Sequence, residues 1–499
     1  MAGPDTGFII VRLSPEATRR AWHHEDLQTA AHAADMSGLA RVLETYQVTT
    51  RRGVTAISPD AVARLETQAR SGGYSSEYSL NSYWVIDARS VADRASLLQS
   101  LKTSPGVDLV YQHVEGGEPG NNFKATYAFS AKQQYLKPAP VGIDATFGWA
   151  ERCGGGHKTG FVDIEQGWFV ALGTPGDIQH EDLPAPALFP GVPRETSPNA
   201  CPPSFHHGTA VLGIVCGLDN GTGVMGIARQ AREMEVASHR QNGVAGFVAN
   251  AITAVLSHLQ PGDVLLIEYQ DGANRPAETD PLTKQAIGTA IGLGMIVVEP
   301  AGNMNVDLDT VPELNRSSPG FSDSGAIVVA GCKSTLDASG TGHDRWVTTA
   351  ADFVLPGPIP PFLADCGYGM VPPFFPGSNF GSRVDCYAWG EQVVSAGYGW
   401  LAGTSPANSY TDRFSGTSAA AAIVAGTAVV VQSIATCLTG TPLTCLQIRE
   451  LLRTTGTPRG SGGAEAMGTM PDLKRAIGAL VAAHTPAPPK NVRIITEPT

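Results

Sequence analysis

Residues 414–426 of this chain are FSGTSAAAAIVAG, and the small apolar residues continue to Val431. Such a stretch predicts a helix that is buried on all sides. Ser418 lies at its amino end, where the helix dipole and the free backbone N–H groups favour negative charge. An acyl-transfer nucleophile needs that stabilisation for its oxyanion, whereas the simpler interpretation is an ordinary serine N-cap. The stretch therefore predicts a central helix with a candidate nucleophile at its start.

Short apolar strands alternate with helices on either side of this stretch, between residues 125 and 480. The expected strands cover residues 160–162, 234–238, 264–269, 295–299 and 326–330, and helices are expected at 247–259 and 282–293. Continuous apolar strands that alternate with helices predict a mainly parallel sheet covered on both faces.

Two other segments place ionisable side chains at the ends of such elements. Asp163 ends the apolar strand that begins at Gly160, and functional groups gather at the carboxyl ends of parallel strands. His207 precedes a run of small and apolar residues, and its neighbour His206 is a second candidate. Each residue taken alone is more often structural, as a turn aspartate or a core histidine.

Taken together, the chain order Asp163, His207, Ser418 is that of the subtilisin triad, and the chain resembles the subtilase family. The resemblance covers roughly residues 133–479. It rests on residues 161–167 (FVDIEQG), 180–183 (HEDL), 207–213 (HGTAVLG), 301–303 (AGN), 378–390 (SNFGSRVDCYAWG) and 416–426 (GTSAAAAIVAG). It implies a three-layer, subtilisin-like α/β fold and a serine endopeptidase.

The resemblance also implies a role for each matching residue. Ser418 would attack the scissile carbonyl, His207 would transfer the proton, and Asp163 would orient His207. The side chain of Asn303 and the backbone N–H of Ser418 would hold the oxyanion.

Substrate backbone would be bound beside this centre. The implied substrate-binding residues are Glu268, Tyr269, Gln270, Ala301 and Gly302.

Three departures from the family pattern stand out. Ala422 replaces a proline that usually follows the nucleophile, and Ile164-Glu165-Gln166 replaces the commoner Asp-Thr-Gly continuation. Glu299 is an unusual acid before the Ala-Gly-Asn segment, and it could either pair with a buried partner or tune the pocket.

The first 113 residues predict a separate α+β domain of the ferredoxin-like type. Strands are expected at 8–13, 54–57, 83–88 and 107–111, with one helix around 39–46 and another around 97–101 that is capped by Ser90. The resemblance implies that this domain is an inhibitory prodomain, which the enzyme itself cleaves off between about residues 112 and 133. The alternative is a permanently attached domain. The predicted remainder is a linker at 114–132, the catalytic domain at 133–480 and a proline-rich tail at 481–499.

Composition limits the partners. The net charge of −12 argues against nucleic acid, and protein or peptide substrates are expected instead, with the N-terminal domain as an intramolecular inhibitor. No uninterrupted apolar run of about 18 residues predicts a membrane span. The absence of a recognisable signal peptide leaves secretion by another route or a cytoplasmic location open.

Eight cysteines lie between Cys153 and Cys445. Cys437 and Cys445 flank a Thr-Gly-Thr-Pro turn and are candidates for a local disulfide, although pairing does not follow from sequence. The chemistry requires no cofactor, and no Cys/His cluster suggests a metal. The family often binds calcium, but no carboxylate cluster is specific enough to assign ligands.

Two other functions compete with an active endopeptidase. One is an inactive relative that keeps the fold, against which the complete set of Asp163, His207, Ser418 and Asn303 argues. The other is a sedolisin-like peptidase with a glutamate base, against which His207 in its His-Gly-Thr context argues.

Overall fold

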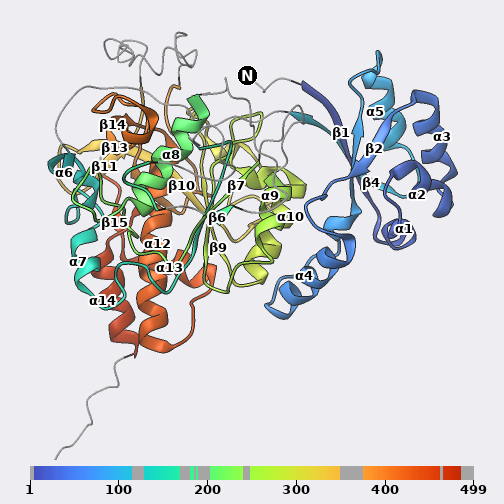
Figure 1. Ribbon diagram of the computed structural model, residues 1–499. Coiled ribbons are helices and arrows are strands. Elements are labelled where there is room, and N and C mark those ends of the chain that lie inside the picture. The colour runs from blue at the N-terminus through green and yellow to red at the C-terminus, as the bar shows by residue number, and fades with distance from the viewer. Residues whose placement is uncertain are drawn as a thin grey trace, which may run out of the picture.

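The computed structural model describes residues 5–114, 129–168, 180–184, 187–188, 203–239, 248–348, 375–460 and 465–484. Most of the predicted linker and of the proline-rich tail lies outside these residues, so the predicted domain boundaries stay predictions. The described chain has a small N-terminal part with an antiparallel sheet and a larger part built on a mainly parallel sheet (Figure 1).

The N-terminal sheet has the strand order β2-β3-β1-β4, and all its pairs are antiparallel. This order, with four of the helices packed on one face, is that of a ferredoxin-like sandwich, as predicted. The strands are β1 (Asp5–Leu13), β2 (Thr49–Arg52), β3 (Tyr83–Asp87) and β4 (Val107–Val114). The helices are α1 (Pro15–Ala21), α2 (Leu27–Ala33), α3 (Ser37–Tyr46), α4 (Pro59–Ser71) and α5 (Arg94–Lys102).

Three details of this domain differ from the prediction. The second strand is Thr49–Arg52 and not residues 54–57, because the backbone N–H groups of Thr55 and Ala56 donate to the side chain of Asn250 instead of to a neighbouring strand. Helix α4 was not predicted, although Ser58 caps it by accepting a hydrogen bond from Ala61 N. Helix α5 is capped by Asp93 and not by Ser90.

The larger sheet contains ten described strands, in the order β15-β16-β12-β10-β9-β8-β5-β7-β6, with β11 beside β10. All pairs except β10–β11 and β15–β16 are parallel, as predicted. The strands are β5 (Phe161–Glu165), β6 (Ala187–Leu188), β7 (Met234–Ser238), β8 (Val264–Ile267), β9 (Ile296–Pro300), β10 (Ile327–Leu336), β11 (His343–Arg345), β12 (Cys386–Trp389), β15 (Thr457–Pro458) and β16 (Thr469–Met470). A separate hairpin pairs β13 (Val393–Ala396) with β14 (Tyr410–Phe414).

Helices cover both faces of this sheet. The described helices of the larger part are α6 (Phe129–Lys132), α7 (Ala145–Ala150), α8 (Pro203–Cys216), α9 (Val248–Val255), α10 (Pro281–Gly292), α12 (Thr417–Thr439), α13 (Cys445–Thr455) and α14 (Leu473–His484). Successive strand residues point to opposite faces. Thus Phe161 packs in the core formed with α8 and α12, while Val162 packs in the core formed with α9 and α10.

Helix α12 is the predicted buried central helix. Its length and apolar composition would suffice to cross a membrane, but 83% of its most apolar window is buried inside the protein. It contacts β8, β9, β10 and β12 on one side and α8 and α14 on the other. We therefore assign it to the core of the larger part.

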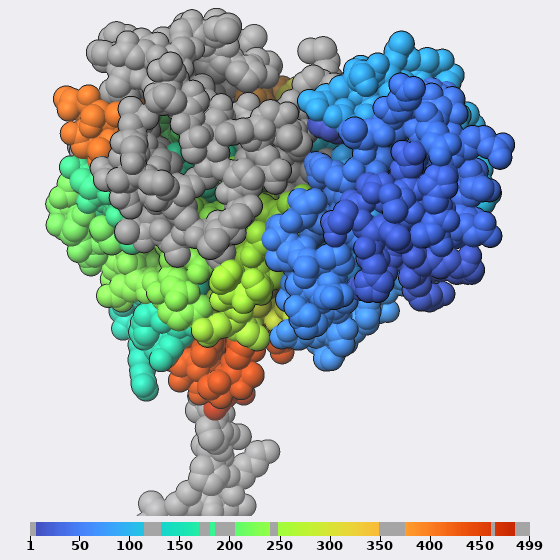
Figure 2. All heavy atoms as spheres, turned by 45° about the vertical axis from the view of Figure 1, so that its right-hand side comes forward, coloured from blue at the N-terminus to red at the C-terminus, as the bar shows by residue number. Residues whose placement is uncertain are grey.

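The N-terminal domain packs on α9 and α10, and Figure 2 shows it in blue against the yellow-green surface of the larger part. Phe8 and Ile10 of β1 belong to the same apolar core as the two helices. Asn250 in α9 accepts hydrogen bonds from the N-terminal domain and donates one to Gly53 O (3.0 Å). Helix α4 comes so close to α10 that a Cβ atom on Gly72 would lie 1.8 Å from Gly292 O. The two parts therefore share a close-packed interface.

The disulfide differs from the predicted pair. Cys437, in the last turn of α12, is bonded to Cys153, with 6.5 Å between the two Cα atoms. Cys445 is a buried free thiol at the start of α13, and its Sγ lies 3.3 Å from Gly325 O. The turn between Cys437 and Cys445 thus joins two helices whose cysteines face different neighbours.

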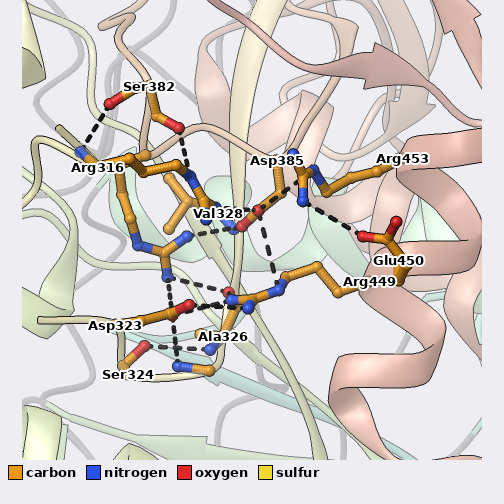
Figure 3. Close-up of polar contacts among 12 residues, drawn as sticks. Arg316, Asp323, Ser324, Ala326, Val328, Ser382, Asp385, Arg449, Glu450 and Arg453 are labelled. Carbon is orange, nitrogen blue, oxygen red and sulfur yellow. Dashed lines mark hydrogen bonds and ion pairs between the residues drawn. The ribbon is translucent and has the colours of Figure 1, made fainter.

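Charged residues attach α13 to the amino-terminal ends of β10 and β12. In Figure 3, Asp385 lies among Arg316, Arg449 and Arg453. Its carboxylate accepts a hydrogen bond from Arg316 (2.7 Å) and one from the backbone N–H of Val328 (3.1 Å). A buried carboxylate is tolerated when it is paired and hydrogen-bonded in this way.

A fully buried arginine joins this network to the other face of the sheet. Arg383 donates to both carboxylate oxygens of Glu278 (2.5 and 2.9 Å) and to Asp385 (2.6 Å). Glu299 of β9 accepts a hydrogen bond from Glu278 N (3.0 Å), so Glu299 has a buried partner. Burial, together with the neighbouring charge of Glu278, raises the pKa of Glu299 to about 8.

This raised pKa predicts a pH-dependent effect of Glu299→Gln. Because the pKa is higher in the folded than in the unfolded protein, Glu299 stabilises the fold most below about pH 4.5, and this contribution is lost as the pH rises towards about 8. Glutamine does not titrate, so the variant should gain on the order of 1–3 kcal/mol relative to wild type between these pH values. Urea unfolding of both proteins at pH 4.5 and pH 8 measures the difference; the same difference at both pH values would contradict the prediction.

Candidate active site

A buried hydrogen bond joins strand β5 to helix α8. Nδ1 of His207 lies 2.6 Å from Oε2 of Glu165, and both side chains are buried. The other carboxylate oxygen of Glu165 accepts the backbone N–H of Gln166 (2.8 Å). A carboxylate held in this way orients an imidazole and stabilises its cation.

The acid at His207 is therefore Glu165, where we had predicted Asp163. The two residues point to the same face of β5, but Asp163 lies two positions, or about 6.6 Å, further from the carboxyl end of the strand. The Asp163 carboxylate accepts the indole N–H of Trp168 (2.7 Å). The sequence carried a signal for this assignment, because Glu165 is followed two residues later by Gly167, the spacing of the Asp-Thr-Gly pattern.

Gly208 allows α8 to approach β5. A Cβ atom at this position would lie 2.3 Å from Gly167 O, 2.7 Å from Cγ of Glu165 and 2.8 Å from Cδ1 of Trp168. Contacts shorter than 3 Å are not tolerated between such atoms. Glycine at position 208 therefore allows the close approach between His207 and Glu165.

The neighbouring His206 has a structural contact. Its Nδ1 accepts the backbone N–H of Tyr398 (3.0 Å), and its imidazole is buried. Burial lowers the pKa of His206 to about 4, with a smaller effect from His180. At neutral pH it is therefore an uncharged hydrogen-bond acceptor of the core.

Ser418 is the second residue of α12, and its side chain is buried. Among the described residues, neither Ser418 Oγ nor His207 Nε2 makes a hydrogen bond. Their elements are in contact, since α8 packs on α12 and the ring of Phe414, four residues before Ser418, meets the His207 ring edge to face at 5.1 Å. Such hydrogen bonds are often open without substrate.

Asn303 lies at the start of the same helix. Its Oδ1 accepts hydrogen bonds from the backbone N–H (2.8 Å) and the hydroxyl (2.9 Å) of Thr417. Its Nδ2, fully buried, has no hydrogen-bond partner among the described residues. An amide that is fixed through its oxygen, with its N–H₂ group left over, suits the stabilisation of an oxyanion.

Two amide side chains support the segment around Asn303. Gln270 Oε1 accepts the backbone N–H of Asn303 (3.2 Å). Asn379 donates to Ala301 O (2.7 Å) and accepts the backbone N–H groups of Met304 and Val306. Asn379 belongs to the Ser-Asn-Phe-Gly stretch of the sequence, but nothing in the sequence indicated which loop it holds.

The other predicted substrate-binding residues lie close by. Glu268 directly follows β8 and is fully buried. Tyr269 meets the His239 ring edge to face at 5.2 Å, and it lines a hollow of about 190 Å³ together with Tyr111 and His113 of the N-terminal domain. Gly302 has φ +101°, and its N–H donates to the hydroxyl of Thr417 (3.2 Å).

One group among the described residues brings metal-ligating atoms together. Ligand atoms of Cys153, His157 and Cys437 lie within 4.8 Å of one another. The two sulfur atoms are bonded to each other. Metals bind thiolates, so the disulfide leaves a single imidazole, too few ligands for a metal centre. Calcium binding stays a prediction without assigned ligands.

Comparison with known proteins identifies the family. The subtilase family model matches residues 186–470, which is more than half of the chain. The chain belongs to the subtilase family. The family and the fold are therefore those of the subtilisin-like serine proteases. The match includes His207, Asn303 and Ser418 but begins after β5, so the strand that carries Asp163 and Glu165 lies outside it.

A solved structure related to subtilisin shares this fold at low identity. Fervidolysin from Fervidobacterium pennivorans, described as a keratinolytic enzyme related to subtilisin, has a TM-score of 0.56 and 16% identity to this chain. The alignment covers 96% of this chain, which spans 61% of the length of fervidolysin. A protease from Pseudoalteromonas arctica aligns with 70% of this chain and 97% of its own, with 19% identity and a TM-score of 0.46. A search of curated proteins found no match.

The close approach at Gly208 predicts that Gly208→Ala disrupts the subtilase site. The added methyl group would push α8 away from β5 and separate His207 from Glu165, with an expected loss of about 1–3 kcal/mol in unfolding free energy. Thermal unfolding and cleavage of a peptide substrate measure the two effects.

Gly478→Ala is the matched control for this variant. Gly478 lies within α14, and its new Cβ would meet no atom within 4 Å, so the fold should be unchanged or up to about 1 kcal/mol more stable. If Gly208→Ala behaves like this control, the close approach does not constrain the site.

Proposed function

We propose that the protein is an active serine endopeptidase whose triad is Ser418, His207 and Glu165. The observation that carries the proposal is the buried hydrogen bond from His207 to Glu165, which leaves the imidazole Nε2 without a hydrogen bond to any described residue. In this arrangement Nε2 is available to take a proton from a nucleophile. The packing of α8 on α12 supports Ser418 as that nucleophile.

The reaction then follows from the groups at the start of α12. Ser418 Oγ attacks the scissile carbonyl while His207 takes its proton, and Glu165 stabilises the resulting imidazolium. The Asn303 Nδ2 group and the amino end of α12 stabilise the oxyanion. His207 then gives the proton to the leaving amine, and water releases the acyl group from Ser418 by the same steps in reverse.

We propose further that the N-terminal domain is an inhibitory prodomain. This proposal is supported by the packing of the domain on α9 and α10, through a shared apolar core and the hydrogen bonds of Asn250. Tyr111 in β4 donates a hydrogen bond to Asp280 at the start of α10 (2.5 Å). The end of β4 also lines one hollow together with Tyr269, which belongs to the segment at 268–270 where we predict that substrate binds.

Exchanging each acid of β5 for its amide tests which of them belongs to the triad. Glu165→Gln should lower kcat by about 10⁴-fold, because an amide cannot stabilise the imidazolium and favours the wrong tautomer. Asp163→Asn should lower it by less than about tenfold, since Asn still offers an oxygen to Trp168. Steady-state kinetics on one peptide substrate compares the two, and the reverse order of effects would restore Asp163 to the triad.

Replacing the nucleophile tests activity and self-processing together. The full chain with Ser418→Ala should lose about 10⁶-fold in kcat on a peptide library and should stay intact. The wild-type chain should cleave itself between about residues 112 and 133, which N-terminal sequencing of the mature protein locates. Equal cleavage of the library by both proteins would refute the assignment of Ser418 as the nucleophile. An active wild-type chain that keeps its N-terminal domain attached would refute only the proposal that the protein is a self-processing zymogen.

A further inference from the structure

We propose that Trp168 is a positioning residue for the Glu165–His207 pair and that Asp163 acts on this pair through Trp168. The inference rests on the proposed function, because it takes Glu165 and His207 to be catalytic. It assigns a role to the second buried acid of β5, which the reaction itself does not use.

Asp163 and Trp168 are joined by a buried hydrogen bond. The indole N–H of Trp168 donates to Oδ2 of Asp163 (2.7 Å), and both side chains lie in the interior. A hydrogen bond in a low-dielectric interior is electrostatically stronger than one in water. The ring of Trp168 is thereby held in one orientation at the point where the chain leaves β5.

The held ring lies at the contact between β5 and α8. Cδ1 of Trp168 and Cγ of Glu165 both lie within 3 Å of the position that a Cβ atom on Gly208 would occupy. Gly208 directly follows His207. The indole, the glutamate side chain and the first half of α8 therefore pack on one another, so a movement of the ring changes the position of Glu165 relative to His207.

A glutamate at this position needs such support more than an aspartate would. Its side chain has one more rotatable bond, and fixing a rotatable side chain costs conformational entropy. The hydrogen bond from Gln166 N holds Oε1 of Glu165, and Oε2 lies 2.6 Å from Nδ1 of His207. A displacement of about 1 Å in a catalytic group can lower the rate by about 10²-fold. The packed indole of Trp168 further restricts rotation about the side-chain bonds of Glu165.

Trp168→Phe is the primary test. The phenyl ring keeps much of the apolar contact but lacks the N–H group, so kcat should fall by about 10- to 100-fold. KM should change by less than about twofold, because Trp168 acts through Glu165 and not on the substrate. Trp149→Phe is the matched control, since it removes a comparable indole hydrogen bond, to Ile227 O (2.8 Å), on α7. The control should leave kcat unchanged.

A double-mutant cycle separates positioning from a general loss of structure. If Trp168 acts through the carboxylate, Trp168→Phe should lower kcat further by less than about twofold in a chain that already carries Glu165→Gln. A purely structural defect would lower kcat by the same factor in both backgrounds. Equal factors, or a control variant as slow as Trp168→Phe, would overturn the inference.

A second pair of variants tests the hydrogen bond between Asp163 and Trp168 by changing its acceptor. These variants replace the primary test if Trp168→Phe does not fold. Asp163→Ala removes the acceptor and should reproduce the loss of kcat, whereas Asp163→Asn keeps an oxygen for the indole and should recover most of it. Equal kcat for the two variants would overturn the inference. Failure of the proposed function is distinguishable, because Glu165→Gln would then retain wild-type kcat.

Discussion

Helix α8 lies so close to the carboxyl end of β5 that position 208 has no room for a side chain. This contact brings the imidazole of His207 to the carboxylate of Glu165 in the interior, where water does not compete for the hydrogen bond. The pair forms only while the strand, the turn that follows it and the helix stay packed together. The site therefore depends on the tight packing of the core on this face of the sheet.

The parallel sheet explains how the remaining groups reach the same place. The carboxyl ends of parallel strands lie at one edge, so the end of β5, the residues after β8 and the segment after β9 are neighbours in space. The central helix α12 is packed beneath them and presents Thr417 and Ser418 at its amino end. Thr417 and Asn379 then hold the segment that contains Asn303.

The N-terminal domain uses the opposite face of the sheet. It covers α9 and α10, whereas α8 and α12 lie on the face that carries His207 and Ser418. In this arrangement the end of β4 lines a hollow together with Tyr269, while the apolar core of the domain is shared with α9 and α10. Its ferredoxin-like order could be predicted from alternating strands and helices. The place of its second strand could not, because Asn250 of the other part binds the backbone at Thr55 and Ala56.

The sequence by itself determined the subtilisin-like fold and the buried central helix, because periodicity and short motifs are local properties of the chain. The same motifs predict His207, Asn303 and Ser418 as site residues. Tertiary structure decided which acid meets the histidine. Asp163 and Glu165 are two residues apart on one face of one strand, and only the depth at which α8 crosses that strand distinguishes them. The same holds for the disulfide, since Cys153 is 284 residues from Cys437 and no local pattern connects the two.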